Sequence, residues 1–262
     1  MKTRNMNFKK FLNTVMVVLL FLSVGFSAAH CKDKTSPCEK ENDRIDEILE
    51  RLTAETAERE FFQARIEYLV SQPLFESETL RKGQIYYVKQ KDFSALRIDF
   101  KTVKQDDEKE RKELEQYVFD GVWLTRIDHQ MKSVKKRQFA DANSPQEPFA
   151  LASRDFPIVG FTRTEDLKKD FDLTLVKEDE KQIHLNLKVK KGSYYGDDYT
   201  VIDFWIDKKL YVPTRITAVS TEEDVFQIDI IKPKINRKIN KKVFEIKYPA
   251  DFNVDKVIRL EK

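Results

Sequence analysis

The residues most able to do chemistry are few in this sequence and lie far apart. Beyond the N-terminal tail the chain has two histidines, His129 and His184. Neither belongs to a His-Glu-x-x-His pattern or to another close histidine pair, so the sequence offers no ligand set for catalytic zinc. Ser153 stands in Ala-Ser-Arg-Asp, not in the Gly-x-Ser-x-Gly turn that presents the nucleophile of many hydrolases. These residues predict no catalytic centre.

A second polar group lies in a glycine-containing segment. Asp197 and Asp198 could bind Ca²⁺ together with a carbonyl oxygen, but adjacent aspartates next to a glycine are typical of a turn. Gly192 and Gly196 are too sparse to form a phosphate-binding loop. We therefore expect no metal, no cofactor and no enzymatic activity.

The first 29 residues have the order of a secretory signal. The first ten residues include four basic residues and no acidic one: Lys2, Arg4, Lys9 and Lys10. An apolar run over residues 15–26 follows, and Ser27 and Ala29 take the −3 and −1 positions of a cleavage site. An uncleaved membrane anchor is the alternative, but this run of about 12 residues is shorter than the roughly 20 that a spanning helix needs. The sequence predicts a cleaved signal peptide over 1–29 and a protein that works outside the cytoplasm.

The two cysteines, Cys31 and Cys38, lie in a polar tail over residues 30–40. In an oxidising compartment they are candidates for a disulfide, and two free thiols are the alternative. Lipidation of Cys31 is a further alternative, but a bacterial lipoprotein signal places a small residue before the cysteine, where this chain has His30. We therefore expect the lipid-anchored form less than the soluble secreted one.

The charge of the protein changes once the signal is removed. The whole chain has a net charge of +3, and loss of the four basic residues leaves −1. The remaining charges are dense and mixed in sign, as in Glu-Lys-Glu-Arg-Lys-Glu at residues 108–113. No basic stripe is present, so we expect no nucleic-acid partner.

Hydrophobic periodicity predicts one helix followed by a long series of strands. Apolar residues recur every three or four positions over 39–57, which is typical of an amphipathic helix. The period then becomes two, and turns such as Asp120-Gly121 separate many of the runs. Tight turns favour an antiparallel meander of roughly eleven strands. The runs cover 62–70, 85–89, 96–103, 117–120, 122–128, 131–138, 172–177, 183–189, 200–206, 214–220, 225–231 and 243–247.

Two short helices are expected between the strands, over residues 148–154 and 164–169. The central segment around them is rich in phenylalanine, and a sheet of this size must close into a barrel or be covered on one face. These aromatic side chains either fill a core or line an apolar ligand site. No repeat or linker interrupts residues 41–262, which we interpret as one domain.

The order of these segments resembles the LolA-like family of periplasmic lipoprotein carriers. The end of the chain, Phe-Glu-Ile-Lys-Tyr-Pro followed by Val254 and Asp255, is the closest match. Residues 118–123, Val-Phe-Asp-Gly-Val-Trp, resemble the family's Asp-Gly hairpin. The other matching segments are 49–52, 61–64, 83–89, 93–100 and 148–155.

The resemblance implies a mainly β (α+β) fold, an incomplete antiparallel barrel with an N-terminal helix and a helical lid over an apolar cavity. The residues it assigns to a lipid-binding cavity are Phe62, Ile66, Ile85, Leu96, Ile98, Phe100 and Trp123. Those it assigns to the lid are Phe149, Leu151, Phe156 and Phe161, with Arg154 or Lys91 as an anchor. Two features depart from the family: Gln-Lys-Asp at 90–92 replaces an Arg-Pro, and the segments 57–82 and 105–115 are longer.

The function that the resemblance implies is transport of acylated lipoproteins. Such a carrier accepts its cargo from an inner-membrane ABC-type complex and passes it to an outer-membrane acceptor, and we expect it to be a monomer. A sensor or partner-binding module on the same fold is the main alternative, because a fold does not settle function.

Overall fold

The computed structural model describes residues 37–91, 93–145, 164–193, 195–255 and 257–259. All of them belong to one compact unit, Ser36–Lys262. The predicted signal peptide and Cys31 lie outside the described residues, as does the predicted helix over 148–154. The first helix, α1 (Pro37–Ala57), begins with a proline, which is favourable in the first helical turn. Residues 37–40, expected in the polar tail, therefore belong to this helix.

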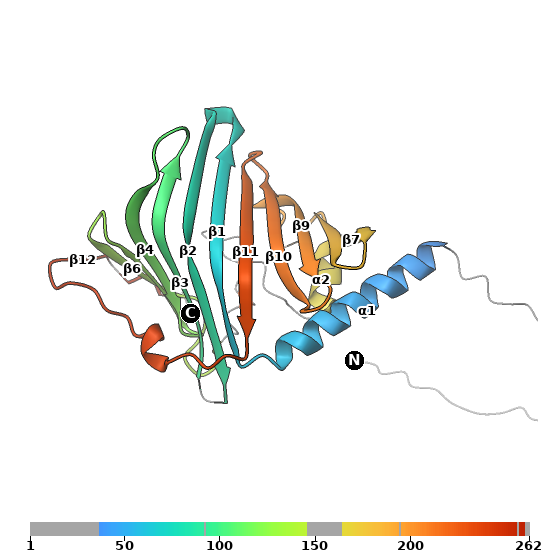
Figure 1. Cartoon of the computed structure of the whole chain (residues 1–262), viewed down its shortest axis with the longest axis horizontal. Coiled ribbons are helices and arrows are strands. Elements are labelled where there is room, and N and C mark those ends of the chain that lie inside the picture. The colour runs from blue at the N-terminus through green and yellow to red at the C-terminus, as the bar shows by residue number, and fades with distance from the viewer. Residues whose placement is uncertain (1–36, 92, 146–163, 194, 256, 260–262) are drawn as a thin grey trace, which may run out of the picture. The chain divides into compact units, whose positions relative to one another are not determined.

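The strands form one 12-stranded sheet in the order β12-β6-β5-β4-β3-β2-β1-β11-β10-β9-β8-β7 (Figure 1). Strands β1 to β6 follow one another in sequence, as do β7 to β11, and the antiparallel pairing of β1 with β11 joins the two runs. The strands are β1 (Phe61–Gln72), β2 (Ser77–Gln90), β3 (Phe93–Gln105), β4 (Arg111–Phe119), β5 (Trp123–Asp128), β6 (Ser133–Gln138), β7 (Phe171–Glu178), β8 (Gln182–Val189), β9 (Tyr199–Asp207), β10 (Val212–Ser220), β11 (Val225–Ile235) and β12 (Asn253–Val254). The prediction of a mainly β, incompletely closed antiparallel sheet with a helix is confirmed.

One prediction about the C-terminal segment is wrong. Residues 243–247 do not form a strand, because a 3-10 helix, η3 (Lys241–Phe244), is capped there by the side chain of Asn240. Ile239 and Phe244 bury against three residues of β1, β2 and β3 instead: Phe61, Val88 and Ala95. The segment thus packs on a face of the sheet. The chain rejoins the sheet edge only at β12, which pairs with β6 in parallel.

The two segments that are longer than the family pattern extend hairpins. Residues 57–82 include β1, a single 3-10 turn η1 (Pro73–Phe75) and the start of β2. Residues 105–115 include the turn between β3 and β4 and the first half of β4. The extra residues of these two segments therefore lengthen the neighbouring strands β1, β2, β3 and β4.

One face of the sheet carries the hydrophobic core, and we call it the core face. A row of directly paired residues crosses five strands on this face: Phe62, Tyr87, Leu96, Phe119 and Leu124. Cross-strand partners point to the same face, and successive residues alternate, which is the reason for the period of two in the sequence. The opposite face, the outer face, is mostly polar.

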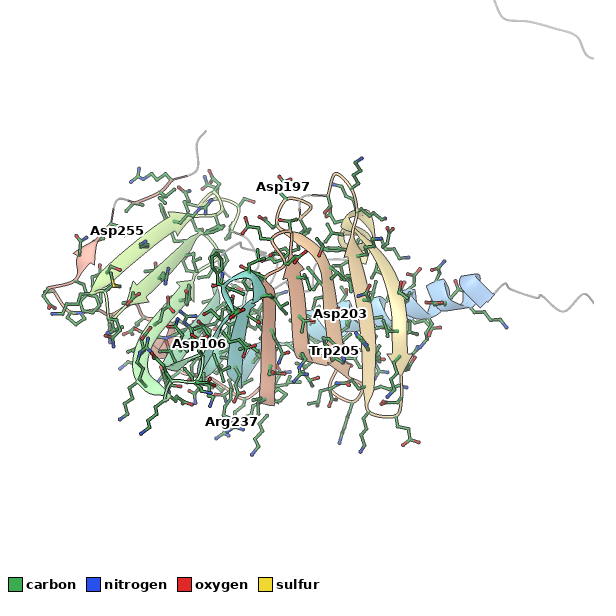
Figure 2. The ribbon with its side chains drawn as sticks, turned by 90° about the horizontal axis from the view of Figure 1, so that it is seen from above. Asp106, Asp197, Asp203, Trp205, Arg237 and Asp255 are labelled. Atoms are coloured by element: carbon green, nitrogen blue, oxygen red, sulfur yellow. The ribbon has the colours of Figure 1, made fainter. Side chains whose placement is uncertain are left out.

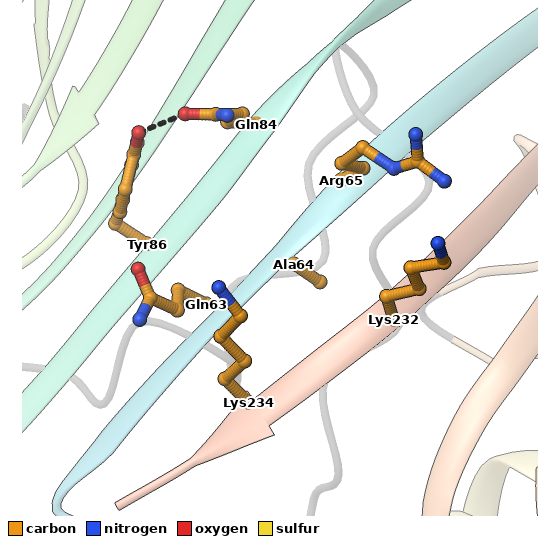
Figure 3. A pocket seen from close by; sticks show the side chains of 7 residues that line it. All are labelled: Gln63, Ala64, Arg65, Gln84, Tyr86, Lys232 and Lys234. Atoms are coloured by element: carbon orange, nitrogen blue, oxygen red, sulfur yellow. Dashed lines mark hydrogen bonds between the residues drawn. The ribbon is translucent and has the colours of Figure 1, made fainter. Parts of the chain in front are cut away.

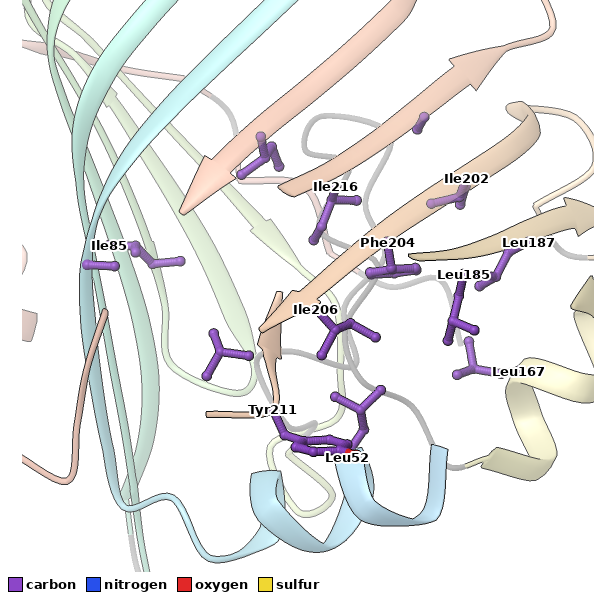
Figure 4. Close-up of a cluster of buried hydrophobic side chains, with 14 of the residues drawn as sticks. Leu52, Ile85, Leu167, Leu185, Leu187, Ile202, Phe204, Ile206, Tyr211 and Ile216 are labelled. Carbon is purple, nitrogen blue, oxygen red and sulfur yellow. The ribbon is translucent and has the colours of Figure 1, made fainter. Parts of the chain in front are cut away.

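Helix α1 covers the core face at the β7 end of the sheet (Figure 1). Its buried residues recur at helical spacing: Ile45, Ile48, Leu49 and Leu52. Figure 4 shows Leu52 beside Tyr211, and Leu167 of α2 (Thr164–Asp170) near Leu185. The expected helix over 164–169 is thereby confirmed.

Polar contacts fasten α1 to the strands beneath it. Arg44 donates two hydrogen bonds to Glu178 at the end of β7, at 2.9 and 2.7 Å, and Lys208 pairs with the same carboxylate at 2.6 Å. Just after the helix, Arg59 is only 6% exposed and donates to the carbonyl oxygens of Leu210 and Tyr211, both at 2.8 Å. Burial lowers the pKa of Arg59. Both ends of the helix are therefore held to the second half of the sheet.

Gly83 permits the closest approach of β2 to β3. A Cβ atom at this position would lie 2.0 Å from the carbonyl oxygen of Asp99 and 2.8 Å from the Cα atom of Phe100. The register of the two strands shifts between Lys82 and Gly83, so this is a local bulge. Gly83 is the first residue of the segment 83–89 that matches the family pattern, and this close approach explains why a glycine is needed there.

We expect Gly83→Ala to lower the free energy of unfolding by about 2 kcal/mol or more, because the added methyl group must displace backbone atoms of β3. Urea denaturation followed by circular dichroism measures this. Glu78→Ala, at an exposed position of the same strand, is the control and should change the value by less than about 0.5 kcal/mol. Equal effects of the two substitutions would show that Gly83 has no special role.

We expect the attachment of α1 to weaken in acid. Hydrogen bonds from Arg44 and Lys208 lower the pKa of Glu178 to about 2, whereas an unfolded glutamate has a pKa of about 4.3. A group with a lowered folded pKa stabilises the protein above its unfolded pKa, and this stabilisation is lost as the pH falls toward the folded value.

Glu178→Gln should therefore be less stable than the parent protein at neutral pH, and the difference should shrink between about pH 5 and about pH 2. Urea midpoints measured across this range test it, with Glu180→Gln at an exposed neighbour as the control. A difference that stays constant with pH would contradict the assignment.

Candidate functional site

The six predicted cavity residues on β1, β2 and β3 lie together on the core face. They are Phe62, Ile66, Ile85, Leu96, Ile98 and Phe100. Each is no more than 8% exposed, and all belong to the main core cluster. Their assignment to a lipid cavity stays a prediction, but their common position is a property of the fold.

The sequence analysis missed two residues of the same surface. Tyr87 lies between Phe62 and Leu96 in the cross-strand row, and Phe119 lies beyond Leu96. Both are less than 3% exposed. Tyr87 is two positions after Ile85, so an extension of the strand alternation would have found it.

Aromatic rings pack against one another on this surface. Phe100 stacks on Tyr68 with the ring centroids 5.9 Å apart, and it meets Tyr117 edge-on at 6.2 Å. Phe119 meets Phe139 in the same edge-on manner at 6.3 Å. Such pairs contribute about 0.5–1.5 kcal/mol each beyond the burial of their area. The aromatic residues therefore form an ordered apolar surface that runs from β1 to the end of β6.

Trp123 does not belong to this surface, and its placement in the cavity is wrong. Leu124, not Trp123, is the cross-strand partner of Phe119. Since successive strand residues point to opposite faces, Trp123 lies on the outer face. Its ring packs there under the ammonium group of Lys136, 4.8 Å from the ring centroid. The error is a slip of one residue across the Asp-Gly turn.

The predicted lid lies outside the described residues, so its role stays a prediction. This applies to Phe149, Leu151, Arg154, Phe156 and Phe161. Lys91, the other proposed anchor, is exposed in the turn between β2 and β3. Of the predicted disulfide pair, Cys38 lies in the first turn of α1.

A pocket of about 320 Å³ lies at the β4–β6 end of the core face. Its lining combines Tyr117 and Leu124 with a set of charged residues: Arg126, Lys135, Lys136, Arg137 and Asp255. Arg126 and Lys135 are cross-strand partners, as are Leu124 and Arg137. These two pairs therefore lie on the same face as the aromatic surface. Across the strands from β4 to β6, apolar side chains are followed by basic ones on this face.

A buried carboxylate stands behind this pocket. Glu115 is 5% exposed and accepts hydrogen bonds from Tyr117, at 2.9 Å, and from Arg126. Arg81 lies 3.4 Å from its other oxygen. Burial, and then the charge of Glu115, raise the pKa of Tyr117, so its hydroxyl stays protonated. Glu115 thus balances the charge of Arg126 within the fold. The other basic residues of the pocket do not pair with Glu115.

A second pocket, of about 300 Å³, lies over the middle of the sheet (Figure 3). Its side chains come from β1, β2 and β11, and include Arg65, Lys232 and Lys234 with the amides of Gln63 and Gln84. The hydroxyl of Tyr86 contacts the amide oxygen of Gln84. This pocket has basic groups without an adjoining aromatic surface.

The two histidines lie in different halves of the sheet. His184 on β8 contacts Asp203 at 2.7 Å and stacks on Trp205 with the ring centroids 4.3 Å apart, and Figure 2 labels both partners on β9. His129, after β5, contacts the amide oxygen of Gln116 at 3.0 Å. Within the described ranges no three His, Cys, Asp or Glu side chains form a group that could hold a metal ion.

The other candidates from the sequence have structural roles or stay undescribed. The backbone oxygens of Asp197 and Asp198 accept hydrogen bonds from Thr221, as expected of a turn. Ser153 lies outside the described residues. In the part of the chain that is described, no helix has the length and apolarity needed to cross a membrane.

No family model and no curated protein matches the sequence. Solved structures do resemble the chain. An uncharacterized conserved protein from Thermus thermophilus is 15% identical, with 83% of this chain and 99% of that chain covered and a TM-score of 0.47. A chain of the MucA/MucB complex from Pseudomonas aeruginosa is 14% identical, with 78% of this chain covered and a TM-score of 0.47. The present chain covers 61% of that chain, less than two thirds of it.

A LolA superfamily protein from Nitrosomonas europaea is also similar, at 14% identity and a TM-score of 0.33, with 77% of this chain and 97% of that chain covered. A putative outer membrane lipoprotein-sorting protein domain from Vibrio parahaemolyticus has the same TM-score. Proteins described as LolA superfamily and as lipoprotein-sorting are therefore among the solved structures whose fold resembles that of this chain.

Proposed function

We propose that the protein is a periplasmic carrier that binds the acyl chains of lipoproteins against the core face and shuttles them toward the outer membrane. The observation that carries the proposal is the row of apolar side chains across β1 to β5, from Phe62 to Leu124, on one face of a sheet that does not close. Burial of each CH₂ group contributes about 0.8 kcal/mol, so an acyl chain has a strong drive to leave water for such a surface.

The remaining parts of the proposal concern the route of the cargo. A signal peptide over residues 1–29 would deliver the protein to the periplasm. There it would accept acylated lipoproteins from an inner-membrane ABC-type complex and release them to an outer-membrane acceptor, acting as a monomer. We infer no enzymatic activity, and turnover of ester substrates by the purified protein would overturn that inference.

A partner-binding module that senses lipid or lipoprotein is the second candidate. The tight packing of the aromatic surface favours it, because Phe100 already contacts Tyr68 and Tyr117 and a guest must displace these rings. A carrier has to offer space for its cargo, whereas a sensor can use the same face as an ordinary core. Measured uptake of acyl chains separates the two functions.

The first experiment is native mass spectrometry of the protein purified from the periplasm, followed by organic extraction and uptake of a fluorescent acyl probe. We expect co-purified lipid or lipoprotein that is released on denaturation, because an apolar surface of this kind suits such chains. A clean apo mass together with no uptake of the probe would favour the partner-binding module.

Substitution at Leu96 tests whether the core face is the binding surface. Leu96→Glu places a charge among apolar side chains, so we expect uptake of the acyl probe to be lost. Leu96→Met keeps the volume and apolarity and should bind like the parent protein. Circular dichroism establishes that both variants fold. Undiminished uptake by a folded Leu96→Glu protein would exclude this surface as the site.

A further inference from the structure

The pocket at the β4–β6 end of the core face joins two kinds of surface. Leu124 and Tyr117 pack against the main core cluster, so the floor of the pocket continues the aromatic surface. Lys135 and Arg137, on the neighbouring strand β6, are exposed at its rim. An amphiphile placed here would meet apolar side chains at one end and cations at the other.

The basic residues of the rim differ in how far their charges are already balanced. Arg126 is paired with the buried Glu115. The ammonium group of Lys135 is 3.9 Å from Asp255, a distance at the limit of an ion pair, and the Lys135 side chain is 62% exposed. The guanidinium of Arg137 lies over the ring of Phe139, 5.0 Å from the ring centroid. No carboxylate of the described residues forms an ion pair with Arg137.

Arg137 is held in a suitable position for an anion. The backbone of β6 around it is bonded on both sides, because Leu124 is its partner on β5 and Ile258 bridges to it from the C-terminal segment. A guanidinium that lies over an aromatic ring, as that of Arg137 does over Phe139, can still form two parallel hydrogen bonds along its edge. Oxygen atoms of a phosphate group match that geometry.

We propose that this pocket binds the phosphate headgroup of an anionic lipid whose acyl chains lie on the adjoining aromatic surface. The proposal rests on the acyl-chain binding proposed above and adds a class of ligand to it: a lipid with a negatively charged polar end. Lys135 and Arg137 contact the phosphate, and Tyr117 and Leu124 contact the first carbon atoms of the chains.

The polar pocket over β1, β2 and β11 provides the contrast. It has about the same volume and also exposes basic residues, Arg65, Lys232 and Lys234, but it lies on the outer face, opposite the aromatic surface. An anion can be attracted there, yet the aromatic surface on which the lipid chains are proposed to lie is on the opposite face of the sheet. Positive charge alone therefore does not distinguish the two pockets, and the adjoining apolar floor does.

The experiment compares short-chain lipids that differ only in the headgroup. Dioctanoyl phosphatidylglycerol, dioctanoyl phosphatidylcholine and dioctanoylglycerol compete with a neutral fluorescent acyl probe for the intact mature protein at low salt. We expect phosphatidylglycerol to bind about tenfold more tightly than the other two, and added salt to reduce this preference because the rim is exposed.

The double variant Lys135→Gln/Arg137→Gln should lose the preference while it still binds all three lipids through their chains. Its control is Lys232→Gln/Lys234→Gln, which removes the same number of charges from the polar pocket and should keep the preference. Both variants alter exposed side chains, so we expect both to fold.

Each other outcome overturns a stated part of the proposal. Equal binding of the three lipids by the parent protein, or an unchanged preference in the rim variant, would refute the headgroup site and leave acyl binding intact. No binding of any lipid would refute the proposed function as well. Competition by inorganic phosphate alone, at the concentration at which phosphatidylglycerol competes, would mean that the rim takes a free ion and that the lipid assignment is wrong.

Discussion

The antiparallel pairing of β1 with β11 makes one sheet out of two separate runs of strands. It extends from the pair Phe62–Ile235 to the pair Ser71–Val225. The partners are far apart in sequence, and the side chains of Gln72 and Asp224, which are 152 residues apart, are hydrogen-bonded across it. The entropy of loop closure grows only slowly with length, so a long ladder can offset this separation. Without the pairing, the core face would end at β1 on one side and at β11 on the other.

Different elements pack on the two halves of the core face. On the β7–β10 half, α1 and α2 supply apolar side chains, and the contacts of Arg44 with Glu178 and of Arg59 with Tyr211 hold α1 in place. On the β1–β5 half, the described helices supply no such fastening, and the surface is made of aromatic and branched side chains from the strands themselves. A guest that entered on the β7–β10 half would have to break charged contacts. On the other half it would meet the aromatic packing around Phe100 and the buried ion pairs that Glu115 makes with Arg81 and Arg126.

Local alternation in the sequence was sufficient to predict most strands, the first helix and the common face of six of the seven residues that the resemblance assigned to a cavity. Local alternation did not predict the face or the secondary structure of residues whose position depends on segments distant in the sequence. Trp123 follows a tight turn, and only the pairing of Phe119 with Leu124 decides which face it takes. Residues 243–247 alternate like a strand, yet burial of Phe244 against the outer face and the cap at Asn240 favour a 3-10 helix. The β1–β11 pairing has no local signal at all, because either strand could have been an edge.

The basic residues make the two ends of the aromatic surface different, because they lie at its β5–β6 end. Across β1 to β3 the core face is mostly apolar, and Arg126, Lys135 and Arg137 add basic groups to it on β5 and β6. The buried Glu115 balances Arg126 and thereby lets an arginine approach Tyr117 without an unpaired charge in the core. Two further cations at the exposed edge then add a positive field where the apolar surface meets water, and such a field acts over about a Debye length of 10 Å or less in salt. A chain-bearing molecule would therefore enter this face in one orientation, with its tail toward β1 and its polar end at β6, and the order of the strands in the sheet sets that orientation.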